Sequence, residues 1–127
     1  MESLMNCEIT LDIDLIENIS GGNQTYEISF SAKDNLKYKL IFRHAWDMRC
    51  SIENASIDRF CEFRRYLPED LIDNNIFLVK NSDYIKYFET QVSGTRPIDA
   101  LKHYILYDNV DCTIDVLTIE EPTLLKL

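Results

Sequence analysis

The sequence has few of the residues that interrupt secondary structure, and it lacks the segments that direct a chain to a membrane. It contains only three glycines and three prolines in 127 residues, which argues against linkers, low-complexity segments and long loops. The N-terminal stretch MESLMNCEITLDIDLIEN has no basic region and no continuous apolar run, so we expect no signal peptide. No segment approaches the roughly 18 consecutive apolar residues of a membrane helix. We therefore expect one cytoplasmic domain over residues 1–127.

Motifs that would identify a catalytic activity, a bound cofactor or a metal site are also absent. The sequence has no GxGxxG or GxxxxGK(S/T) phosphate loop, no GxSxG nucleophile motif, and no HExxH or CxxC metal motif. The two histidines, His44 and His103, are far apart. We therefore predict a protein that is not an enzyme, with no catalytic residues, no cofactor and no metal. The cysteines are widely spaced, which favours free thiols in a reducing compartment; they are Cys7, Cys50, Cys61 and Cys112.

Basic residues are in a clear minority. The 22 acidic residues outnumber the 13 basic ones, giving a formal net charge of −9. A phosphate backbone would be repelled, so we expect no nucleic-acid partner. A basic protein partner would instead be attracted, and its association can be accelerated by roughly 10–1,000-fold. Most of the excess lies at the two ends of the chain: residues 1–31 carry six acidic groups and no basic one, and residues 104–127 carry five against one.

Hydrophobic periodicity in the N-terminal half is that of β-strands. Apolar and polar residues alternate with a period of two over residues 7–15, 26–32, 38–43 and 46–53. GGNQ at 21–24 predicts a turn, because glycine tolerates positive φ. In the strand at 46–53, alternation predicts a core face formed by Trp46, Met48, Cys50 and Ile52. The same alternation predicts an opposite, charged face formed by Asp47, Arg49, Ser51 and Glu53.

The C-terminal half mixes strand and helix signals. The run at 76–79 predicts a buried strand, and Ser82 is a candidate N-cap for an amphipathic helix that ends at Gly94. Pro97 can begin a second short helix. A closing hairpin over 104–107 and 110–119 is expected to turn at Asp108-Asn109, with an inward face formed by Val110, Cys112, Ile114 and Val116. The sequence thus predicts an α+β fold: a mostly antiparallel sheet of about six to eight strands with one or two short helices around residues 82–103.

Five of the six arginines lie within residues 43–66, together with the only tryptophan. Acidic residues are interleaved with them, so pairing across neighbouring strands accounts for most of this charge. Two places remain candidates for a surface contact with a partner. One is Arg64-Arg65 followed by Tyr66, and the other is Arg96 in the loop SGTRP, since loops often carry function.

Two stretches carry a resemblance to a known group of proteins. They are YKLIFRHAWDMRCSIENASIDRF and the closing HYILYDNVDCTIDVLTIEEP. With its size and acidity, the chain resembles the small acidic immunity proteins that bacteria encode beside polymorphic or contact-dependent toxins. The resemblance implies a stoichiometric inhibitor that binds a basic toxin domain. An acidic partner complements such a domain, so we expect the contact to be formed by Asp12, Asp14 and Glu17, or by Asp108, Asp111 and Asp115.

Two other functions remain open. An acidic protein of a phage or mobile element could mimic DNA and bind a host DNA-binding enzyme, which predicts carboxylates spread along one elongated face. A small-ligand-binding protein or enzyme would instead gather His44, Cys50 or Arg96 in a deep pocket.

Overall fold

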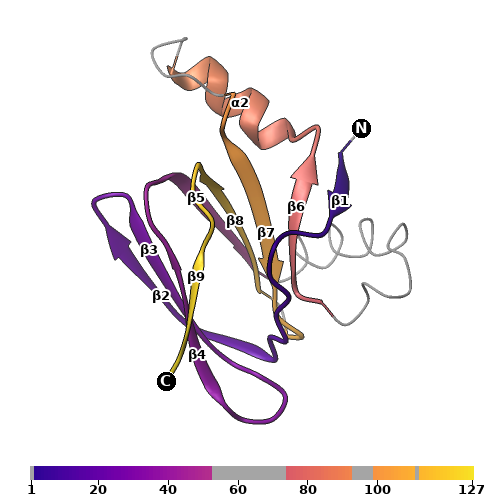
Figure 1. Ribbon diagram of the computed structural model, residues 1–127. Helices are drawn as coiled ribbons and strands as arrows, with labels where there is room; N and C mark the ends of the chain where they lie inside the picture. The colour runs from indigo at the N-terminus through magenta and orange to yellow at the C-terminus, as the bar shows by residue number, and fades with distance from the viewer. Residues whose placement is uncertain (1, 53–73, 93–98, 111) are drawn as a thin grey trace.

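The computed structural model describes residues 2–52, 74–92, 99–110 and 112–127, which form nine strands and one helix (Figure 1). The predicted α+β fold with a mostly antiparallel sheet is confirmed, although the strands divide between two sheets. In chain order the elements are β1 (Ser3–Met5), β2 (Leu15–Gly22), β3 (Thr25–Ser31), β4 (Lys37–Phe42), β5 (Ala45–Ile52), β6 (Ile76–Lys80), α2 (Asp83–Val92), β7 (Lys102–Tyr107), β8 (Cys112–Thr118) and β9 (Thr123–Lys126).

The two sheets bury their apolar faces against each other. One sheet has five strands in the order β1-β6-β7-β8-β5, and the other has four in the order β2-β3-β4-β9. Alternate residues of a strand point to one face, and those that point between the sheets form the main core, which includes Ile28, Phe30, Leu40, Phe42, Ile76, Tyr104, Leu106, Ile114 and Val116. Helix α2 packs at one end of the five-stranded sheet (Figure 1), on the face opposite the main core, where Tyr84 contacts Leu101 and Leu117. No helix of the described residues combines the length and apolarity needed to cross a membrane.

The turn predicted at residues 21–24 is confirmed, but the residues with positive φ are not the glycines. Asn23 and Gln24 join β2 to β3 with φ of 51° and 68°, the signs that a two-residue hairpin turn requires. Glycine is required at position 21 because there is no room for a side chain. A Cβ atom at this position would lie 2.4 Å from the carbonyl oxygen of Thr25 and 2.8 Å from the ring of Tyr26.

Residues 7–14 alternate as predicted but do not form a strand. Leu11 and Ile13 are buried, while the alternating residues Asp12 and Asp14 are exposed. The amides of Leu11 and Ile13 donate to the side-chain oxygens of Asn74 and Asn75, at 3.0 and 3.2 Å. Because amide side chains take the place of a neighbouring strand's backbone, the segment is extended without a regular ladder. The first long strand, β2, therefore begins only at Leu15.

A bulge in β5 corrects the predicted faces of that strand. The register with β8 shifts between Ala45 and Asp47, so Trp46 leaves the core between the sheets and packs against Phe88 of α2, with ring centroids 6.1 Å apart. Met48 packs against the main core as predicted. A bulge adds one residue to a strand and reverses the faces on one side of it, which is why alternation alone gave the wrong face for Trp46.

In the C-terminal half, the predicted start of the helix at Ser82 and the predicted closing hairpin, β7 and β8, are both confirmed. Ser82 caps α2, since its Oγ accepts the amide of Ile85 at 3.0 Å. Cys112, Ile114 and Val116 face the main core. Val110 was expected to do so but is 59% exposed, because the ladder ends where Asp108 pairs with Cys112. The expected helix end at Gly94 and the second helix at Pro97 lie outside the described residues.

Candidate functional site

The N-terminal acidic residues predicted to contact a partner lie on the surface. Asp12, Asp14 and Glu17 are all exposed. Asp12 pairs with Lys33 at 3.8 Å, and Glu17 pairs with Lys37 at 2.7 Å. Asp14 forms no ion pair with any described residue. Two of the three carboxylates are therefore partly neutralised, one by Lys33 in the β3–β4 turn and one by Lys37 at the start of β4.

Two of the three C-terminal acidic residues, Asp108 and Asp115, are buried. Asp108 is 8% exposed; one carboxylate oxygen accepts the amides of Val110 and Cys112, and the other accepts the amide of Ile16. Asp115 is completely buried. The expectation that these two form a contacting patch is wrong, because their carboxylates satisfy polar groups of the interior.

The remaining sequence candidates lie outside the described residues. They are Asp111, Arg64, Arg65, Tyr66 and Arg96. Their role in binding stays a prediction.

A small hollow opens beside the N-terminal acidic residues. Its volume is about 180 Å³, and it is lined by Thr10, Leu11, Asp12, Phe30, Ala32, Asp34, Tyr38 and Leu124. Leu11 and Phe30 are buried and give it an apolar floor, while Asp12 and Asp34 are exposed at its rim. Typical small-molecule sites span roughly 300–1,000 Å³. This hollow suits a single side chain better than a cofactor.

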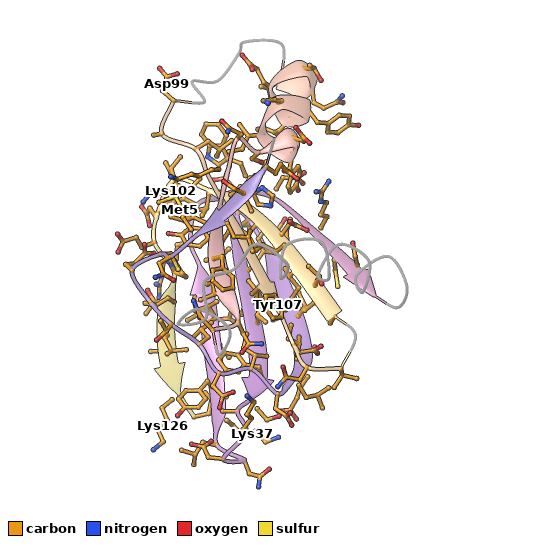
Figure 2. The ribbon with its side chains drawn as sticks, turned by 90° about the vertical axis from the view of Figure 1, so that its right-hand side faces the viewer. Met5, Lys37, Asp99, Lys102, Tyr107 and Lys126 are labelled. Atoms are coloured by element: carbon orange, nitrogen blue, oxygen red, sulfur yellow. The ribbon has the colours of Figure 1, made fainter. Side chains whose placement is uncertain are left out.

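Two hydrogen bonds join the segment that holds Asp12 and Asp14 to the end of β3 and the β3–β4 turn. The carboxylate of Asp12 accepts the amide of Lys33 at 3.3 Å, in the turn that also holds Asp34. The amide of Asp14 donates to the carbonyl of Ser31 at 2.8 Å, at the end of β3. We call Asp12, Asp14 and Asp34 the acidic end. It lies near the start of β4, at the end of the molecule where Figure 2 labels Lys37, and opposite the end where it labels Asp99.

A second constellation lies under α2 and was not expected from the sequence. The Oγ of Ser82 is 2.6 Å from Nδ1 of His103, and Nε2 of His103 is 2.6 Å from Oδ1 of Asp115. All three residues are buried. With a neutral imidazole, Ser82 donates to Nδ1 and the Nε2 proton is donated to Asp115; this tautomer is assigned from the hydrogen bonds. Oδ2 of Asp115 lies 3.5 Å from Nε of Arg49.

Serine, histidine and aspartate in this order also occur in hydrolytic triads, but the setting here is different. Ser82 is 5% exposed, and its Oγ is already occupied by the amide of Ile85 that it caps. A nucleophile must reach a substrate carbonyl and have oxyanion donors nearby. The geometry instead fixes the start of α2 to β7 and β8.

Aromatic and charged groups extend this network toward the solvent. The guanidinium carbon of Arg49 lies 4.1 Å from the centroid of the Tyr84 ring. The hydroxyl of Tyr84 donates to Asp47 at 2.6 Å. Burial, reinforced by the hydrogen bond and charge of Asp47, raises the pKa of Tyr84 well above its usual value.

A second hydrogen bond between a tyrosine and a carboxylate lies on the other face of the five-stranded sheet. The hydroxyl of Tyr104 donates to Glu8 at 2.6 Å, and burial together with Glu8 raises the pKa of this tyrosine. Burial also raises the pKa of the nearby Cys7 thiol, which disfavours the reactive thiolate.

Of the residues expected to gather in a ligand-binding pocket, His44 and Cys50 lie apart, and Arg96 lies outside the described residues. His44 is exposed in the β4–β5 turn, 3.5 Å from Glu120. Cys50 is six residues further along the chain, in β5, a separation of roughly 20 Å at the rise of an extended chain. Across the described residues, no group of three or more His, Cys, Asp or Glu side chains is placed to hold a metal ion.

Comparison with known proteins adds no relative: no family model, no curated protein and no solved structure matches this chain.

Proposed function

We propose that this chain is an immunity protein that binds a basic bacterial toxin domain in a stoichiometric complex and neutralises it. The observation that carries the proposal is the acidic end, where two exposed carboxylates rim a hollow with an apolar floor. The net charge of −9 favours a basic partner. The toxin as that partner comes from the resemblance in size, acidity and organisation.

The hollow suits the side chain of a lysine or arginine from the partner. The aliphatic part of such a side chain can lie on Leu11 and Phe30 while its charged end stays near water. The cation can then pair with Asp12 and Asp34 at the rim. Tyr38 adds an aromatic face, stacked on Phe30 with centroids 5.6 Å apart, which can attract a cation.

The lysine that already pairs with Asp12 is a weak competitor. Lys33 lies 3.8 Å from the carboxylate, and its side chain is 56% exposed. Exposed ion pairs of this kind contribute about 0–1 kcal/mol. A cation from the partner can therefore displace Lys33 at little cost.

The arrangement of charges favours this proposal over DNA mimicry. On the four-stranded sheet, Glu17 pairs with Lys37 and Glu27 pairs with Lys39. Carboxylates that replace phosphates would form a row without interspersed cations. We therefore favour a local acidic contact over a phosphate-like face.

The test uses the toxin domain encoded beside the gene for this chain, purified as an inactive variant. Association is followed by stopped flow at several salt concentrations. A triple variant, Asp12→Asn, Asp14→Asn and Asp34→Asn, removes three charges but keeps the amide oxygens that accept backbone hydrogen bonds. We expect its association rate to fall by about tenfold and its salt dependence to flatten. Asp99→Asn, at the opposite end of the molecule, is the matched control and should change neither.

Co-expression with the active toxin tests the immunity role directly. The chain should restore growth to cells that produce the toxin domain, and the triple variant should do so less well. If no neighbouring toxin domain binds the chain or is neutralised by it, the immunity role is wrong. If binding is tight but the triple variant associates as fast as the original, the acidic end is not the contact.

A further inference from the structure

We propose that Cys50 and Cys112 are a redox-active pair of thiols that closes to a disulfide when the protein meets a peroxide. Their sulfur atoms are 3.4 Å apart. Cys50 lies on β5 opposite Ile114, and Cys112 lies on β8 opposite Ile52. The two cysteines are therefore diagonal neighbours on one face of adjacent antiparallel strands. Nothing in this pairing depends on the proposed immunity role.

The two thiols differ in their access to an oxidant. Cys50 is exposed, whereas Cys112 is buried at the border of the main core. Oxidation selects accessible thiols, and redox-active cysteines are often placed beside a second cysteine that resolves the first product. Cys50 has the position of the attacking thiol, and Cys112 that of the resolving one.

The reaction requires only the peroxide. The Cys50 thiolate attacks one peroxide oxygen, the O–O bond breaks, and the departing hydroxide takes a proton to form water. Cys50 is then a sulfenic acid. The Cys112 thiolate attacks the Cys50 sulfur, the S–O bond breaks, and the second hydroxide leaves as water after protonation. The two thiols together lose two protons and two electrons, and hydrogen peroxide is reduced to two waters.

Only a small movement is needed to form the bond. A disulfide has an S–S length of about 2.05 Å, so the sulfur atoms must approach by roughly 1.4 Å from their present 3.4 Å. In the described sheet β5 is an edge strand that pairs with β8. An edge strand is held along one side only, so it can make this shift without displacing a second neighbour.

The disulfide would link the edge strand covalently to the centre of the sheet. It would also close a long loop across residues 51–111. Cross-links that close long loops restrict the unfolded chain and stabilise the fold. We therefore expect the oxidised protein to unfold at a higher urea concentration than the reduced protein.

The experiment treats the reduced full-length protein with hydrogen peroxide under native conditions. Remaining thiols are then alkylated, and the protein is digested and analysed by mass spectrometry. We expect a monomer that has lost two hydrogen atoms, with the peptides of Cys50 and Cys112 joined. Cys7→Ser and Cys61→Ser variants should keep this product. Cys50→Ser should abolish it, and because Cys50 is exposed the variant should remain folded.

Other products would overturn the proposal. These are a Cys50 recovered as sulfinic acid while Cys112 is alkylated after unfolding, a link from Cys50 to Cys7 or Cys61, or a disulfide between two molecules. A joined peptide that forms equally well in urea would also count against it, because the reaction would not depend on the folded geometry. A Cys112→Ala variant, checked for folding by circular dichroism, should leave Cys50 as the oxidised residue.

Discussion

The buried polar residues under α2 are held by several partners each. His103 uses both ring nitrogens, one toward Ser82 and one toward Asp115, and Asp115 also faces Arg49. Hydrogen bonds to a charged group in the interior are strong because little water competes with them. Removing one member takes a hydrogen-bond partner away from each residue that contacted it. The loss therefore exceeds the value of a single hydrogen bond.

Asp115→Ala should destabilise the protein strongly. The change leaves the Nε2 of His103 without an acceptor and removes the carboxylate opposite Arg49. Leaving the buried Nε2 donor unsatisfied in this way costs about 1–3 kcal/mol. Urea unfolding followed by circular dichroism measures the change. Asp99→Ala, at an exposed position, should alter the free energy of unfolding by no more than about 0.5 kcal/mol. Equal effects of the two variants would show that the network contributes little.

Among the larger elements, residues 7–14 are held by two asparagine side chains and by single backbone hydrogen bonds rather than by a regular strand ladder. Asn75 accepts the amide of Ile13 and donates to the carbonyl of Tyr107 at 2.8 Å. Asn74 accepts the amide of Leu11 at 3.0 Å. Two side chains thus join the N-terminal segment to the start of β6 and the end of β7.

Asn75→Ala should loosen this segment and lower the stability of the whole fold. It leaves the buried amide of Ile13 and the carbonyl of Tyr107 without these partners, and each unsatisfied group costs about 1–3 kcal/mol. We expect a total loss of roughly 2–4 kcal/mol in urea unfolding. Hydrogen exchange should also become faster at the amides of Leu11 and Ile13. Asn18→Ala, at an exposed position in β2, is the control and should change neither measurement.

Elements with an uninterrupted period could be predicted from the sequence. Strict alternation or a short apolar run predicts β3, β4, β6 and β8. The start of α2 is predicted by Ser82, because a serine hydroxyl can cap a helix. The face of Trp46 could not be predicted, because the bulge depends on the register with β8. The burial of Asp108 and Asp115 was missed for a related reason. Their partners are backbone and side-chain groups that approach only in the folded chain.

One signal for the buried network was present in the sequence. Asp115 lies among apolar residues in one strand of the predicted hairpin, and His103 directly precedes the other strand. A polar residue on a buried face requires a partner, and the hairpin supplies one for each. The contribution of Ser82 could not be found in this way, because it depends on where α2 packs.

For the molecule as a whole, two tyrosines on opposite faces of the five-stranded sheet couple folding to alkaline pH. The pKa values of Tyr84 and Tyr104 are both raised by burial and by a hydrogen-bonded carboxylate. A raised pKa in the folded state means that the fold favours the protonated phenol. This stabilisation is fully present below the unfolded pKa of about 10, and it is lost as the pH rises further toward the folded pKa.

Stability should therefore fall steeply above about pH 10. Each of the two tyrosines contributes a slope of up to about 1.4 kcal/mol per pH unit. The variants Tyr84→Phe and Tyr104→Phe should each flatten the decline of the unfolding free energy between about pH 9 and pH 11. Tyr87→Phe is the control, since Tyr87 is 62% exposed. A decline of the same steepness in all three variants would contradict the coupling.

The bulge in β5 also gives the molecule a natural optical reporter. Trp46 is the only tryptophan of the chain, and it lies between β5 and α2 against Phe88 rather than between the two sheets. Its fluorescence will therefore follow the separation of α2 from the sheet, while far-ultraviolet circular dichroism follows the strands. If the two signals change at different denaturant concentrations, the helix detaches before the sheets separate. If they coincide, helix and sheets unfold as one cooperative unit.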